Sequence, residues 1–113
     1  MNAALLQDAP DEKLIALFVE GNSRAFEVLV SRHQVRLYNF IRYRTGDPEL
    51  AKDLLQEVFL RVVRRASTFG GRARFKTWLY TIARNLCTDQ GRKAKHRRIE
   101  VLDPAMNGGE QRP

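Results

Sequence analysis

The sequence predicts an all-α protein, a compact bundle of about four helices. Apolar residues recur at spacings of three and four along most of the chain, no segment alternates apolar and polar residues as a strand would, and Gly or Pro stands between the periodic segments. With 113 residues, 43% of them apolar, the chain has the size and composition of one globular domain. We expect this domain to span residues 10–98, between an N-terminal tail (1–9) and a linker or tail (99–113).

The first helix is expected over residues 10–20. Pro10 suits a first turn because the amide proton that proline lacks would have no partner there, and Gly21 ends the run. Its apolar residues share one face: Leu14, Leu17 and Phe18.

The second helix is expected to begin at Asn22 or Ser23, either of which can cap exposed amides, and to end at Gly46. Its inward stripe recurs at spacings of three and four: Phe26, Leu29, Val30, His33, Leu37, Phe40 and Ile41. We interpret His33 as a packing or surface residue, because no His/Cys cluster has metal-ligand spacing. The single cysteine, Cys87, excludes an internal disulfide, and we expect no cofactor.

The third helix is expected to be capped by Asp47, to carry Pro48 in its first turn and to end by Ala66 or Ser67. Its apolar stripe has seven members: Ala51, Leu54, Leu55, Val58, Phe59, Val62 and Val63. Such a stripe predicts a helix with one face buried against its neighbours.

A polar patch lies opposite that stripe. Asp53, Gln56, Glu57 and Leu60 follow one another at steps of three and four, with Arg61 beside them, so they form one exposed surface. An acidic patch with an apolar neighbour suits a basic partner, although such a face is more often simply solvated. No nucleophile stands near a base in the pattern, and we expect no enzyme.

A loop with two adjacent glycines is expected over residues 68–74, followed by a fourth helix from Phe75 into the Lys/Arg-rich end. We expect Gly91 to weaken this helix and a linker to follow Arg98. Its inward residues are expected to be Phe75, Trp78, Leu79, Ile82, Ala83 and Leu86.

Charge is divided unevenly along the chain. The net charge is +7, yet residues 61–98 hold 12 Lys and Arg against Asp89 alone, whereas residues 1–60 hold 7 against 9 Asp and Glu. A basic block of this kind is typical of a contact with a polyanion, although it can also be a solvated helix face. No stretch is long and apolar enough to span a bilayer, no secretory signal is visible at the start, and we expect a cytoplasmic protein without membrane insertion.

The loop and the fourth helix mix aromatic and cationic residues, a pattern typical of single-strand binding, in which cations follow phosphates and rings stack on bases. The candidate nucleic-acid-binding residues are Phe69, Gly71, Arg72, Arg74, Lys76, Tyr80, Arg84, Asn85, Thr88 and Arg92. From the residues alone, the prediction is a helical nucleic-acid-binding module. Phe75 and Trp78 are expected in the core, and the role of Phe69 is open between packing and binding.

Three segments in order, residues 21–27, 46–61 and 69–86, resemble region two of the extracytoplasmic-function sigma factors. The resemblance covers about residues 11–98. It implies that the polar patch (Asp53, Gln56, Glu57, Leu60 and Arg61) binds the coiled-coil clamp of the RNA polymerase β′ subunit. It also implies that the loop and the fourth helix recognise the non-template strand of the promoter minus-ten element, with one base flipped into a pocket of the loop. An anti-sigma factor is a further expected partner.

The chain departs from the family pattern in two respects. Thr81 and Ile82 occupy the positions where housekeeping relatives carry a tryptophan pair that helps to open the strands. The second family domain, a helix-turn-helix, is absent after residue 98, and we expect a piece of a longer factor. Two alternatives stay open: a sigma-like protein-interaction module, either a decoy or a form sequestered by an anti-sigma factor, and a generic module binding single-stranded nucleic acid or RNA.

Overall fold

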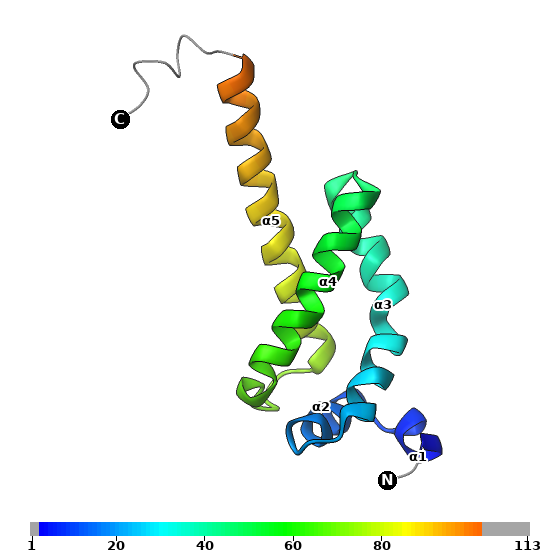
Figure 1. Ribbon diagram of the computed structural model, residues 1–113. Coiled ribbons are helices and arrows are strands. Elements are labelled where there is room, and N and C mark those ends of the chain that lie inside the picture. The colour runs from blue at the N-terminus through cyan, green and yellow to red at the C-terminus, as the bar shows by residue number, and fades with distance from the viewer. Residues whose placement is uncertain (1–2, 103–113) are drawn as a thin grey trace.

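The computed structural model describes the backbone of residues 3–102 and the side chains of residues 5–93. Within these limits all the secondary structure is helical, without a strand, which confirms the all-α prediction (Figure 1). The elements are α1 (Ala3–Asp8), α2 (Asp11–Val19), α3 (Ser23–Thr45), α4 (Pro48–Arg65), the 3-10 turn η1 (Ala66–Thr68) and α5 (Phe75–Leu102).

Three of the expected helix ends form at the expected residues. The Asn22 side chain accepts a hydrogen bond from the backbone N–H of Ala25 at 3.2 Å, and the Asp47 carboxylate accepts from the first-turn amides of α4. Gly46 closes α3 in the left-handed conformation, at φ +71°. These caps satisfy amides and carbonyls that have no partner inside the helix.

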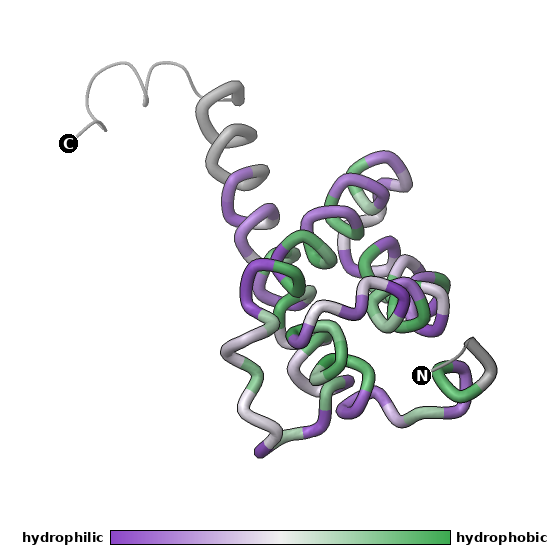
Figure 2. Tube along the Cα trace, turned by 60° about the horizontal axis from the view of Figure 1, so that its bottom comes forward, coloured by the Kyte–Doolittle hydropathy of each residue, from purple (hydrophilic) through white to green (hydrophobic). Residues whose placement is uncertain are grey.

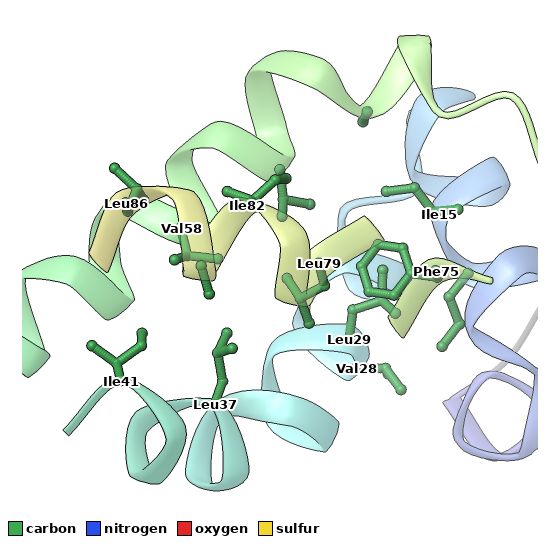
Figure 3. Packing of buried hydrophobic residues seen from close by; sticks show 14 of the residues in the cluster. Ile15, Val28, Leu29, Leu37, Ile41, Val58, Phe75, Leu79, Ile82 and Leu86 are labelled. Carbon is green, nitrogen blue, oxygen red and sulfur yellow. The ribbon is translucent and has the colours of Figure 1, made fainter. Parts of the chain in front are cut away.

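The core lies where α5 packs between α3 and α4 (Figure 3). Leu37 and Ile41 of α3, Val58 of α4 and Leu79 of α5 are all fully buried. Each large apolar side chain removed from water contributes about 1.5–3 kcal/mol to folding. Figure 2 shows apolar residues gathered inside the bundle, whereas the part of α5 that leaves it is mostly hydrophilic.

The N-terminal segment, expected to be a tail, instead contains a helix, α1. Leu6 is 1% exposed and Ala9 is also buried, so the segment contributes to the core. Arg32 of α3 holds the end of α1, since its guanidinium donates 2.9 Å hydrogen bonds to the carbonyl oxygens of Gln7 and Ala9. Six residues are too few for an isolated helix, and these tertiary contacts explain why the sequence pattern missed it.

The N-terminus of α2 is tied to two other helices. The Asp11 carboxylate binds Arg32 and the Nε2 atom of His33, each at 2.9 Å. Its neighbour Glu12 reaches α5, where one carboxylate oxygen accepts a hydrogen bond from the Phe75 backbone N–H at 2.7 Å. His33 is buried and its ring lies beside Phe75, in agreement with the packing interpretation.

The fourth predicted helix, α5, is longer than expected. The helix continues through Gly91 to Leu102, so the expected linker begins with helical residues, 99–102. The rest of that linker, residues 103–113, lies outside the described part of the chain. The helix accommodates Gly91 because a glycine inside a helix costs only about 1 kcal/mol relative to alanine.

Candidate functional site

The predicted polar patch on α4 forms, with one member partly covered. Asp53 and Gln56 are exposed, and Leu60 is 47% exposed. Glu57 is half-buried because one carboxylate oxygen accepts hydrogen bonds from Arg61 at 3.3 Å and from a second arginine, Arg64, at 3.4 Å. The patch is therefore less acidic than its sequence indicates, since two guanidiniums share the Glu57 charge.

An apolar groove of about 610 Å³ adjoins this patch, between α3 and α4. Its lining residues are Phe26, Val30, Gln34, Lys52, Asp53, Leu55, Gln56, Phe59, Leu60 and Val63. Three patch residues thus stand on one wall of a hollow whose other wall belongs to α3. The sequence reasoning did not find this hollow, because it depends on how two helices pack.

The width of the α4 stripe was the signal that could have revealed the groove. The seven apolar residues form two rows on the helix. One row is buried in the core: Ala51, Leu54, Val58 and Val62. The second row lines the groove: Leu55, Phe59 and Val63. Val63 is 43% exposed, which corrects the expectation that the whole stripe is buried.

The loop before α5 forms a second hollow, of about 440 Å³, within the usual size of ligand sites. It is lined by Thr68, Phe69, Gly70, Arg72, Ala73 and Trp78. Gly71 has φ +74°, a conformation that favours glycine. Arg72, which lines the hollow together with the rings of Phe69 and Trp78, is exposed, whereas Arg74 is exposed outside the lining.

Ring packing holds this loop against the bundle. The Phe69 ring lies 5.2 Å from the Trp78 ring and 6.0 Å from that of Phe75, centroid to centroid. Phe75 is fully buried, as expected, whereas Trp78 is half-buried and lines the hollow, which corrects its assignment to the core alone. The Glu12 carboxylate at the Phe75 amide fixes the point where the loop becomes a helix.

Five of the six candidate residues on α5 are exposed: Lys76, Arg84, Asn85, Thr88 and Arg92. Arg92 lies 3.7 Å from Asp89, in an exposed pair. The sixth candidate, Tyr80, is only half-exposed, since its ring packs edge-on against Phe40 of α3 at 5.1 Å. Burial raises the pKa of Tyr80, and the nearby Arg36 opposes that shift.

The described residues contain no cluster of His, Cys, Asp and Glu that could hold a metal, and no helix among them is long and apolar enough to cross a membrane. Cys87 is buried, and burial raises the pKa of its thiol while Arg44 of α3 opposes the shift.

Comparisons with known proteins point to a single family. The family model for sigma-70 region 2 matches residues 29–97. The chain is 40% identical over 77 residues to the ECF RNA polymerase sigma factor SigX of Bacillus subtilis, covering 68% of this chain and 40% of that protein. It is 41% identical over 87 residues to the ECF RNA polymerase sigma factor BldN of Streptomyces coelicolor, covering 76% of this chain and 33% of that protein.

A third relative, the RNA polymerase sigma-H factor of Pseudomonas aeruginosa, is 35% identical over 81 residues, which cover 72% of this chain and 42% of the relative. The chain therefore matches less than half the length of each of these three relatives.

Proposed function

The chain belongs to the sigma-70 region 2 family, as the region 2 domain of an ECF sigma factor, and we propose that it docks on core RNA polymerase and captures the unpaired non-template strand of the promoter minus-ten element. The observation that carries this proposal is the separation of two hollows with different chemistry. One is apolar with a polar rim, and the other is lined by two aromatic rings and an arginine, Arg72. The chain would thereby take part in transcription initiation.

The groove between α3 and α4 suits the coiled-coil clamp of the β′ subunit. A helix binds a groove by laying apolar residues into it, and here Leu55, Phe59 and Val63 provide the apolar floor. Asp53 and Gln56 on the rim can pair with basic or polar side chains of the clamp. An anti-sigma factor that covers this groove would compete with the polymerase.

The loop hollow suits a base that has left the duplex. Extracting a base costs a few kcal/mol, and an aromatic wall can offset about 1–3 kcal/mol through stacking. Trp78 and Phe69 provide such walls, and Arg72 is placed for an adjacent phosphate. Asn85 and Arg84 stand exposed farther along α5, where they can hydrogen-bond base edges.

Strand opening is proposed to depend more on promoter sequence than in housekeeping relatives. At the positions of their tryptophan wedge this chain has Thr81, half-buried, and Ile82, which is 5% exposed. Neither presents a large ring to the duplex, so unstacking must be driven by capture of the bases.

Polymerase docking is tested by a pull-down of the chain with the β′ clamp coiled coil. The double variant Gln56→Ala/Glu57→Arg should lose binding at least tenfold, because it removes one rim contact and reverses a charge in the adjoining polar patch. The control Glu27→Arg/Asn39→Ala makes matched changes at exposed positions of α3 outside the groove and should bind normally. Equal binding by both variants would reject this interface.

Sequence reading is tested with single-stranded oligonucleotides that carry or lack a minus-ten motif. Asn85→Ala should reduce the preference for the motif by about 1–3 kcal/mol if its amide reads a base edge. Asn39→Ala, an exposed amide of α3, is the control. An unchanged preference in Asn85→Ala would remove this residue from the reading set.

A protein-interaction module that never contacts DNA is the second candidate function, and the apolar groove is the observation that favours it. The salt dependence of DNA affinity distinguishes this candidate from the proposed function. Phosphate contacts require log affinity for DNA to fall linearly with log salt, whereas a decoy should show no DNA affinity. A generic single-strand binder would show the salt dependence without a preference for the minus-ten motif.

A further inference from the structure

The Glu57 carboxylate of the polar patch is bound at one oxygen by two arginines of its own helix. The Nε atom of Arg61 lies 3.3 Å from Glu57 Oε2, and a terminal nitrogen of Arg64 lies 3.4 Å from the same oxygen. The two arginines differ in exposure, since the Arg61 side chain is 30% exposed and that of Arg64 is 62% exposed. Arg61 is therefore the more deeply packed partner of Glu57, and Arg64 is the one that a second protein can reach.

Arg64 continues the line of the polar patch along α4. The steps from Asp53 to Glu57 and from Glu57 to Leu60 are four and three residues, and a further step of four arrives at Arg64. Residues at these spacings share one face of a helix. A protein laid along this face would therefore meet the Arg64 guanidinium together with the carboxylate that it binds.

The contact between Arg64 and Glu57 is weak enough to be exchanged for another. Hydrogen bonds from a guanidinium to a carboxylate are usually about 2.7–2.9 Å long, whereas this one measures 3.4 Å. Both side chains reach solvent, which screens the attraction, and such exposed ion pairs contribute little to the stability of a fold. Breaking this pair would therefore cost the fold little, yet it would reduce the net gain from any new pair that Glu57 forms with a partner.

We propose that Arg64 weakens docking on the polymerase, because its guanidinium occupies the Glu57 oxygen that a basic side chain of the β′ clamp would bind. The inference rests on the proposed function for the clamp as the partner of the patch. Docking is then an exchange, in which Glu57 releases one cation of its own chain and accepts one from the partner. Arg64 acts through Glu57, and it sets the affinity for the clamp below the value that the patch alone would give.

The test is a double-mutant cycle that measures the affinity of the 113-residue chain for the β′ clamp coiled coil. The cycle compares the wild type with Arg64→Ala, Glu57→Gln and the double variant Arg64→Ala/Glu57→Gln. Arg64→Ala should bind about two- to fivefold more tightly, because a surface pair of this kind no longer has to be broken. In the Glu57→Gln background the gain should disappear, because no carboxylate remains to be released. A merely structural role for Arg64 could not raise the affinity.

The matched control is Arg65→Ala, which removes the neighbouring exposed arginine, one that forms no ion pair with Glu57 among the described side chains. It should leave the affinity unchanged, and thermal unfolding checks the fold of each variant. Unchanged or weaker binding by Arg64→Ala would overturn the inference, as would a gain that persists in the Glu57→Gln background. Equal gains in Arg64→Ala and Arg65→Ala would also overturn it, because net charge alone would explain them. Failure of the proposed function is distinguishable, since no variant would then bind the clamp.

Discussion

The groove between α3 and α4 and the loop before α5 are assembled from interactions at very different ranges. One wall of the groove is a single 18-residue helix whose side chains follow the helical period. The loop takes its position from rings on α5 and from Glu12, which lies 63 residues before the amide it binds. Which residues of a regular helix share a face can therefore be inferred from spacing, whereas the position of a loop depends on contacts that spacing does not contain.

The largest effect that tests this contrast is expected at two adjacent valines of α4. Val62 is fully buried, whereas Val63 is 43% exposed in the groove. Val62→Ala should lower the free energy of unfolding by roughly 2 kcal/mol, from lost burial and the cavity left behind. Val63→Ala should cost well under 1 kcal/mol and instead weaken binding to the β′ clamp. Denaturant unfolding and the clamp pull-down measure the two quantities.

Each valine variant is the control for the other, since both remove the same atoms from the same helix. If both variants lost similar stability with unchanged clamp binding, the division of the stripe into a core row and a groove row would be wrong.

An intermediate effect is expected from Glu12→Ala. Loss of the carboxylate leaves the Phe75 amide without its helix-capping partner, at about 1 kcal/mol for a cap of this kind. Because that amide marks the end of the loop, affinity for single-stranded DNA should fall while clamp binding stays normal. Equilibrium unfolding and oligonucleotide binding provide the measurements.

Glu27→Ala is the control for Glu12→Ala, because it removes an exposed carboxylate from α3. If Glu12→Ala bound DNA and clamp as the wild type does, the loop would be positioned by its rings alone.

The helices themselves could be predicted well because their limits are local. Asn22, Asp47 and Gly46 act as the sequence indicated, and each does so through its own side chain or backbone conformation. The short helix α1 was missed because it depends on Leu6 burial and on Arg32, more than 20 residues away. Local patterns do not contain such contacts.

For the candidate sites, the sequence predicted which residues take part better than it predicted how they pack together. The polar face of α4 followed from periodicity, but its acidity was overestimated because Glu57 binds Arg61 and Arg64. On α5, Tyr80 was expected to be a binding residue. Its ring instead contacts Phe40, and this contact depends on how two helices pack.

The smallest effects are expected at two glycines, with opposite signs. Gly71→Ala should destabilise the chain by about 1 kcal/mol and weaken single-strand binding, because its φ of +74° disfavours a side chain. Gly91→Ala should stabilise it by about 0.5–1 kcal/mol, since it lies inside α5 and an added Cβ meets nothing within 4 Å. Gly70→Ala, also with open space but without a positive φ, is the near-neutral control. Thermal unfolding resolves the signs, and a stabilised Gly71→Ala would show that the loop does not depend on this backbone conformation.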